Sequence, residues 1–192
     1  MGHLLVVYHA TRLLDHEIDA IRRDGLLPLS EELVRTRIEA AHDLGYLTHN
    51  ERNQLLARNL FVDGSDVSIR EGQVCFFLSR QVLEDEVHGV WNPLTIWGGE
   101  GIFFGQFDEE VEARLRGLGR PAITVAAIEL SDGWRTHPVY PGAFKSFLGR
   151  KLELEEYGSD VFYRAAVPGH QVIDVWLPGH REYERHNELP SL

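Results

Sequence analysis

A histidine and a threonine stand close together near the N-terminus, where a short strand is predicted to end. Residues 4–9 are apolar and partly β-branched, which predicts a buried strand that closes on His9 and is followed by Thr11. Side chains at the end of a strand are exposed yet rigidly held, so these two could bind a ligand. The alternative is that Thr11 caps the next helix and that His9 is an ordinary strand-edge residue.

A carboxylate flanked by glycines is the second unusual feature. Glu100 lies in the run WGGEG at 97–101, and glycines on both sides imply a tight backbone around an exposed side chain. Trp91 and Trp97 would then form the edge of a binding site. The alternative is a plain turn beside tryptophans that belong to the core.

The motifs that the chain lacks exclude several kinds of catalytic site. It has no G-x-S-x-G turn, no P-loop, no G-x-G-x-x-G after a strand and no H-E-x-x-H. Its single cysteine, Cys75, excludes a disulfide framework and a multi-cysteine zinc site. No two of its ten histidines lie four residues apart on a convincing helix face, so we expect no bound metal.

The composition is that of a soluble globular protein with an acidic surface. Of 192 residues, 43% are hydrophobic and 26% are charged, and the net charge is -11. This charge repels phosphate backbones and disfavours broad nucleic-acid binding. No apolar run is long enough to span a bilayer, and no secretory signal opens the chain. We therefore expect a cytoplasmic protein with no membrane association.

Helical spacing dominates the first half of the chain, and strand signals dominate the second. A helix that carries Leu14 and Ile21 is expected to end at Gly25, and a second helix to begin after Ser30. Further helices are expected at 50–60 and 108–117, and strands at 74–78, 122–130, 134–140, 161–167 and 172–177, with 122–130 and 134–140 paired as a hairpin. This order predicts an α+β fold in a single domain, 1–192.

Two segments resemble the ADP-ribosyltransferase superfamily, which includes diphtheria toxin and the poly(ADP-ribose) polymerases. Residues 7–11 (VYHAT) and 21–26 (IRRDGL) are similar to the strand, helix and glycine–leucine loop that open the NAD site of that family. Residues 75–80 (CFFLSR) are similar to its second motif strand, where an aromatic and a small hydroxyl residue flank the nicotinamide. The resemblance implies a split, mixed β-sheet in which His9 and Phe77 lie on adjacent central strands and face one cleft.

The resemblance also implies NAD as the substrate and a set of residues that bind it. In that site a histidine would bond a ribose, an arginine the pyrophosphate, and an aromatic ring would stack on the nicotinamide. The residues in these positions are His9, Thr11, Arg12, Phe77, Ser79 and Arg80.

The third motif of the family is an acidic residue near a late strand. Cleavage of the nicotinamide–ribose bond passes through an oxocarbenium-like state, which a nearby carboxylate stabilises. Asp160 is the first candidate, because it enters the strand expected at 161–167, and it would act together with His9. The rival acidic residues are Glu156, Glu129 and Glu100.

These expectations combine into a function and one alternative. We expect a toxin-like bacterial glycosyltransferase that transfers ADP-ribose from NAD to a protein, a nucleic acid, a small molecule or water. The alternative is a non-enzymatic binding or interaction module on a similar α+β scaffold.

Overall fold

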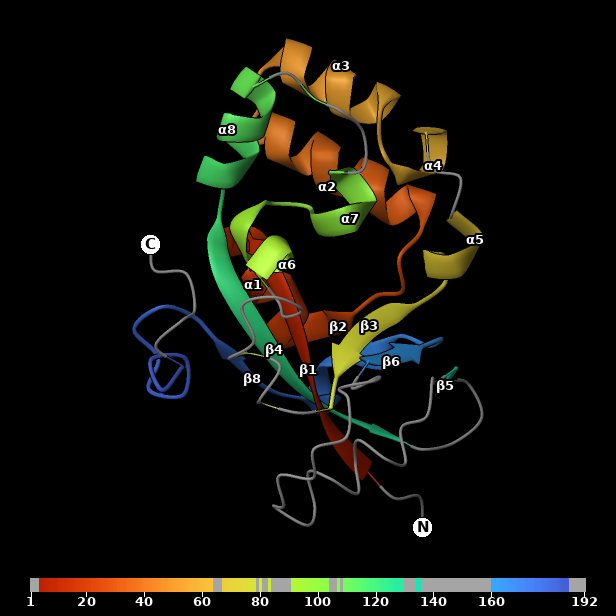
Figure 1. The fold of residues 1–192 in the computed structure, drawn as a ribbon, viewed down its shortest axis with the longest axis vertical. Coiled ribbons are helices and arrows are strands. Elements are labelled where there is room, and N and C mark those ends of the chain that lie inside the picture. Colours follow the sequence, from red (N-terminus) through yellow and green to blue (C-terminus); the bar gives the residue numbers. More distant parts are fainter. Residues whose placement is uncertain are drawn as a thin grey trace, which may run out of the picture.

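A six-stranded β-sheet forms the centre of the computed structural model (Figure 1). The structure describes residues 4–63, 67–78, 80, 83, 91–103, 107, 109–129, 134–135 and 160–186. The strand order is β5-β6-β3-β1-β4-β8. The bounds are β1 Leu4–Leu13, β3 Val74–Phe77, β4 Arg120–Glu129, β5 Trp134–Arg135, β6 Asp160–Tyr163 and β8 Val172–Trp176. A separate ladder joins β2 (Gly25–Leu26) to β7 (Val167–Pro168).

Helices fill the intervals between the early strands. They are α1 Asp15–Asp24, α2 Glu31–Asp43, α3 His49–Ala57, α4 Leu60–Asp63, α5 Val67–Arg70, α6 Trp91–Thr95, α7 Gly99–Ile102 and α8 Glu109–Gly117. Side-chain caps fix two of the starts. The Ser30 hydroxyl accepts a hydrogen bond from the Leu33 amide at 3.1 Å, and Thr48 forms a reciprocal capping box with Glu51. The predicted α+β class is confirmed.

The pairing of the strands differs from the prediction in two ways. Every pair of strands in the described ranges is antiparallel, so the expected mixture of parallel and antiparallel strands is wrong. The expected hairpin of 122–130 with 134–140 is also wrong, because β5 pairs with β6, with Trp134 opposite Tyr163. A turn signal before Trp134 predicts that the chain reverses, but it does not specify which strand receives the returning segment.

The central strand β1 is longer than predicted. Its ladder with β4 continues to Leu13, so His9 lies within the strand rather than at its end. Thr11 is opposite Ala122 in this ladder and is not a helix cap. α1 begins only after Leu14. The extension is favoured because it keeps the backbone hydrogen bonds of the ladder and buries Leu13 to 3% exposure.

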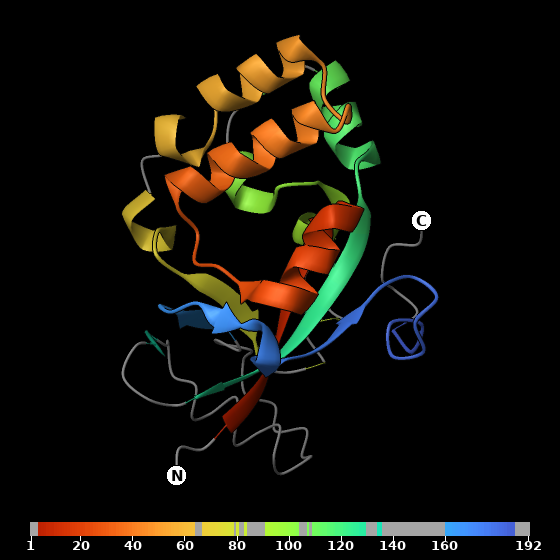
Figure 2. The ribbon, with the colours of Figure 1, turned by 180° about the vertical axis from the view of Figure 1, so that it is seen from behind.

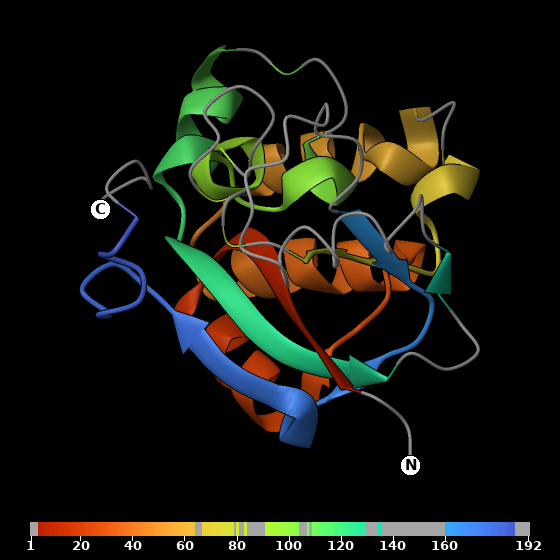
Figure 3. The same cartoon turned by 60° about the horizontal axis from the view of Figure 1, so that its bottom comes forward.

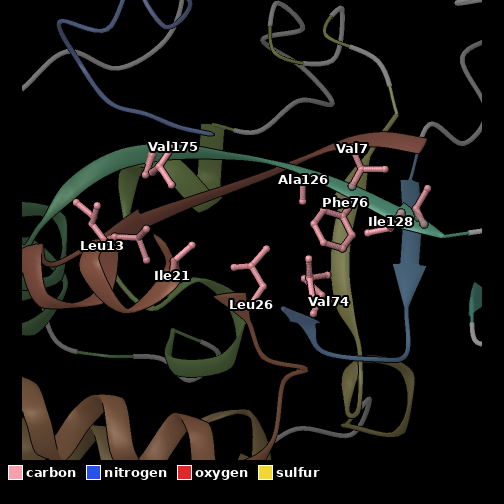
Figure 4. Close-up of a cluster of buried hydrophobic side chains, with 13 residues drawn as sticks. Val7, Leu13, Ile21, Leu26, Val74, Phe76, Ala126, Ile128 and Val175 are labelled. Carbon is pink, nitrogen blue, oxygen red and sulfur yellow. The ribbon is translucent and has the colours of Figure 1, made fainter. Parts of the chain in front are cut away.

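Apolar side chains cover both faces of the sheet. On one face, Val7 and Phe76 pack with Ile21 of α1 and Leu26 of β2 (Figure 4). Seen from behind, α1 lies in front of the ladder of β1 and β4, and α2 lies above α1 (Figure 2). On the opposite face, Tyr8 belongs to a cluster that also contains Val125, Trp176 and Tyr183. β1 is therefore buried from both sides.

A further apolar cluster belongs to the helices. It joins Ile38 of α2, Leu55 of α3 and Leu115 of α8 around the fully buried ring of Trp97. Figure 3 shows α1 and α2 on one side of β1 and β4. We call that side of the sheet the α1 face and the other side the Tyr8 face.

Candidate functional site

His9 projects from the middle of β1 toward the α1 face. Its Nδ1 lies 2.8 Å from the carbonyl oxygen of Cys75 on β3. A carbonyl can only accept a hydrogen bond, so Nδ1 carries the proton and donates it. The ring also meets the edge of Phe76, at 5.9 Å between centroids. One histidine thus links the two strands that carry the two predicted motif segments.

The electrostatic surroundings keep this imidazole neutral. Burial lowers the pKa of His9 below its ordinary value of 6.5, and the nearby positive charge of Arg37 lowers it further, against the opposing effect of the Cys75 hydrogen bond. A neutral ring protonated at Nδ1 has a lone pair on Nε2. His9 therefore offers a hydrogen-bond acceptor, suited to a hydroxyl group, at neutral pH.

A buried hydroxyl lies directly beside His9. Thr124 is the residue opposite His9 in the ladder of β1 and β4, so both side chains belong to the α1 face. Thr124 is fully buried, and its Oγ1 has no hydrogen-bond partner in the structure. Buried hydroxyl groups without a partner are uncommon in folded proteins. The unpaired Thr124 hydroxyl therefore costs the fold stability at this position.

A buried ion pair joins three segments of the helical part of the fold. Glu17 of α1 is 8% exposed, and its Oε1 accepts a hydrogen bond from Nε of Arg37, on α2, at 2.6 Å. Its Oε2 accepts from the Leu14 amide and from the indole Nε1 of Trp97, both at 2.8 Å. The Arg37 guanidinium also lies over the Trp97 ring, 5.3 Å from its centroid. This network fixes α1, α2 and the Trp97 segment relative to one another.

The hydrogen bonds to Glu17 decide its charge state. Burial alone would raise the pKa of this carboxyl. The charge of Arg37 and the hydrogen bonds from Arg37, Leu14 and Trp97 together hold the pKa below its ordinary value of 4.5. Glu17 is therefore ionised at neutral pH in spite of its burial.

The predicted NAD-binding residues do not share one face of the sheet. Phe77 is opposite Tyr8 in the pairing of β1 with β3, so both belong to the Tyr8 face. His9 and Thr11 belong to the α1 face, because successive residues of a strand point to opposite sides. The expectation that His9 and Phe77 face one cleft is therefore wrong, although their strands are adjacent as expected.

Arg12 and Arg80 both interact with groups of the protein itself. Arg12 donates to the Leu118 carbonyl from Nε at 2.6 Å and to the Leu94 carbonyl from Nη1 at 3.3 Å. Arg80 donates from Nε to the Tyr8 hydroxyl at 2.9 Å and lies over the Trp176 ring at 5.0 Å. The structure thus brings both guanidinium groups to the side of the sheet away from His9, where they join segments of the chain.

The acidic candidates are spread along the chain. Asp160 opens β6 and is the register partner of Phe77. Glu129 is exposed at the end of β4, opposite Leu4. Glu100 lies in the short helix α7, whereas the glycines around it predict a tight loop. Ser79 and Glu156 lie outside the described residues.

Trp97 belongs to the core rather than to the edge of a binding site. Its ring is fully buried among the helices. An apolar pocket of about 480 Å³ opens elsewhere, between Leu29, Leu33 of α2 and Gly72, and its lining includes none of the predicted site residues. We therefore place the candidate site at His9 and Thr124, which are opposite in the ladder, with the ion pair of Glu17 and Arg37 joined to them only through the charge of Arg37, which lowers the pKa of His9.

Sequence reasoning missed three members of this cluster. Thr124 is a hydroxyl residue within an apolar strand, and Glu17 is an acidic residue on a helix whose neighbours Ile18 and Ile21 are buried. Each is a polar residue where the sequence pattern predicts a buried apolar one, and this departure could have identified them. Arg37 has no such signal, because the other arginine of α2, Arg35, is exposed.

Comparison with protein-family models, characterised proteins and solved structures finds no match for this chain. Across the described ranges, no group of three or more His, Cys, Asp or Glu side chains is placed to hold a metal ion. The helices seen there are too short or too polar to cross a membrane.

Proposed function

We propose that this chain binds NAD and transfers the ADP-ribose group to an acceptor, as the resemblance of its two motif segments implies. One observation carries the proposal: His9 of the first segment donates a 2.8 Å hydrogen bond to the backbone of Cys75 in the second. Two segments separated by more than sixty residues thus meet at a neutral histidine. A shared NAD site requires such a meeting.

The polar groups around His9 fit such a ligand. Nε2 of His9 can accept a hydrogen bond from a ribose hydroxyl, and Thr124 Oγ1 and Arg37 Nη2 have no partner in the structure. A dinucleotide carries ribose hydroxyls that can donate to Nε2, whereas the two unpaired atoms are fully buried and are not open to a ligand in this structure. This fit supports NAD as the ligand and assigns its polar half to the α1 face.

NAD supplies an activated glycosidic bond, whose cleavage releases nicotinamide. In the proposal, His9 orients a ribose hydroxyl, and a carboxylate stabilises the positive charge that develops on the sugar. Asp160 remains the proposed source of that carboxylate, but as the register partner of Phe77 it occupies a position on the Tyr8 face, on the other side of the sheet from His9. Phe77 remains a candidate only for contacts made from the Tyr8 face.

Two substitutions of His9 separate its two nitrogens and test the proposal. The asparagine amide in His9→Asn can still donate to the Cys75 carbonyl but has nothing at Nε2, whereas His9→Gln places its amide near Nε2. We expect wild-type protein to release nicotinamide from NAD. His9→Asn should weaken NAD binding by about 1–3 kcal/mol, and His9→Gln by less. Calorimetric titration measures the affinity, and chromatography of the reaction mixture measures nicotinamide.

His170→Asn is the matched control, because His170 is exposed and lies in the turn between β7 and β8. It should leave NAD affinity unchanged. Equal NAD affinity in wild type, His9→Asn and His9→Gln would show that His9 takes no part in binding. Incubation with labelled NAD and a cell lysate then identifies the acceptor from whatever carries the label.

Asp160→Asn tests the proposed carboxylate. The substitution keeps the shape of the side chain and removes its charge, so we expect turnover to fall by about a hundredfold while NAD affinity changes little. Nicotinamide release under saturating NAD gives the turnover. Glu129→Gln is the control and should retain the wild-type rate. If Asp160→Asn is fully active and Glu129→Gln, Glu100→Gln or Glu156→Gln is not, the assignment to Asp160 is wrong.

One observation favours the second candidate function, a binding module without chemistry. Arg12 and Arg80, both expected to clamp the pyrophosphate, are engaged by Leu118, Leu94 and Tyr8. A module of this kind would not take NAD as its ligand. The transferase predicts that NAD at a hundred times its dissociation constant stabilises the fold by about 2.7 kcal/mol, whereas no change in stability at millimolar NAD would favour the module.

A further inference from the structure

The apolar pocket beside α2 is a site that the proposed function does not use. Its volume of about 480 Å³ lies within the range of about 300–1,000 Å³ that is typical of small-molecule sites. The apolar side chains of its lining are those of Leu27, Pro28, Leu29 and Leu33. Leu27 is 59% exposed, and nothing lies within 4 Å of a Cβ atom built on Gly72, so the pocket is open to a ligand. A ligand that covers Leu27 removes apolar surface from water, which is favourable.

Hydrogen bonds of the protein fix the two walls of this pocket. One wall is the start of α2, where the Leu33 amide donates to Ser30 Oγ at 3.1 Å. The other wall is the loop at Gly72, whose amide donates to the Leu29 carbonyl at 2.8 Å, while the Leu29 amide donates to the Gln73 carbonyl at 2.9 Å. Leu29 and Ser30 are consecutive, so these bonds join one wall to the other. A pocket that is formed in advance loses little conformational entropy when a ligand binds.

The charges at the pocket favour a cation. Its lining includes the carboxylates of Glu32 and Glu71 and, among the residues that the structure describes, no Lys, Arg or His. Glu32 pairs with Arg35 at 2.8 Å, but the two side chains are 75% and 61% exposed, and a pair of this kind is weak. Arg70, which precedes Glu71, lies over the ring of Phe162, 5.4 Å from its centroid. A positive charge is therefore stabilised next to the apolar surface.

We propose that this pocket binds a small molecule in which an apolar chain or ring carries an amine that is protonated at neutral pH. The apolar part lies against Leu27 and Leu33, and the ammonium group lies near Glu32 and Glu71. A carboxylate of the same chain length brings a negative charge to these two side chains, so the pocket discriminates against it. The proposal is independent of the NAD site, because none of the residues assigned to that site lines the pocket.

Octylammonium is the probe, and octanoate and octanol are its anionic and neutral counterparts. The full chain is labelled with ¹⁵N, and the amide signals of Leu33 and Gly72 report occupation of the pocket. We expect octylammonium to bind at least about threefold more tightly than octanol and about tenfold more tightly than octanoate. Decylammonium should bind more tightly still, by about threefold to fourfold for each added methylene group. The double variant Glu32→Gln/Glu71→Gln should lose the preference for ammonium and keep its affinity for octanol.

Leu27→Ser tests the apolar wall, and Leu44→Ser is its matched control. The two leucines are 59% and 57% exposed, but Leu44 follows the other end of α2 and is not part of the lining. Leu27→Ser should weaken octylammonium binding at least about fivefold, and Leu44→Ser should leave it unchanged. Melting temperatures equal to that of wild type show that both variants are folded.

Three results would overturn the proposal. They are no movement of the Leu33 and Gly72 signals at about 10 mM octylammonium, octanoate that binds as tightly as octylammonium, and a loss in Leu44→Ser as large as that in Leu27→Ser. Sedimentation velocity tests a second copy of this chain as the occupant. A wild-type dimer that dissociates in Leu27→Ser would assign the pocket to that second copy and would also overturn the proposal.

Discussion

Gly25→Ala is expected to lower the free energy of unfolding by about 4 kcal/mol or more. Gly25 has a φ of 98°, and a Cβ atom built on it would lie 1.8 Å from the carbonyl oxygen of Val167. No side chain can move to relieve this contact, since the obstacle is backbone of the β2–β7 ladder. Urea denaturation followed by circular dichroism measures the change.

Gly45→Ala separates the close contact from the cost of the backbone angle. Gly45 has a similar φ of 79°, but nothing lies within 4 Å of a Cβ atom at that position. Its substitution should cost about 1–2 kcal/mol, the ordinary penalty for a side chain in the left-handed region. Equal losses in the two variants would mean that the approach of Val167 to Gly25 is not tight in solution.

Glu17→Gln is expected to destabilise the protein by about 3–5 kcal/mol, because it leaves the charge of Arg37 partly buried without its partner. Glu32→Gln is the control: Glu32 pairs with Arg35 on the exposed side of α2 and should matter by less than about 1 kcal/mol. In the double variant Glu17→Gln/Arg37→Gln most of the loss should be recovered. Losses that simply add would show that the two side chains are not coupled.

The same ion pair predicts an acid-sensitive part of the stability. The pKa of Glu17 in the folded protein lies below 4.5, its value in the unfolded chain. The unfolded state therefore binds the proton more readily, and the contribution of Glu17 is complete above pH 4.5 and lost as the pH falls through the folded pKa. Denaturation midpoints measured between pH 7 and the acid range should drop less steeply for the double variant than for wild type.

Local signals were sufficient for most elements of this fold. Ser30 predicts the start of α2, Gly25 predicts the end of α1, and the apolar run from Val74 predicts β3, because each signal acts within a few residues. Local signals do not predict which strands pair with one another. Pairing of Trp134 with Tyr163 depends on which edge of the sheet is free, and no local pattern contains that information.

Only part of the candidate site could be predicted, because local signals identify His9 but not the residues that the fold brings to it. His9 stands out in the sequence, because a histidine interrupts an apolar strand. Its neighbours Arg37 and Thr124 come from segments about 28 and 115 residues away, and only the register of β1 with β4 and the packing of α2 bring them together. The face occupied by Phe77 follows from one register pair, Tyr8 with Phe77, and a shift of one residue would have reversed it.

The place of β1 at the centre of the sheet also bears on how the chain is made. β1 is synthesised before the strands on either side of it, and β4, with which it forms its longest ladder, follows more than one hundred residues later. At about 5–20 residues per second, roughly 3–12 s of synthesis pass before this strongly apolar strand gains β3 on one edge, and roughly 5–20 s before it gains β4 on the other. Closing a ladder over such a sequence separation is also slow once the chain is complete. While β1 is unpaired, the nascent chain exposes apolar surface that a chaperone can bind. The yield on expression should therefore depend on the speed of translation more than on the stability of the finished fold.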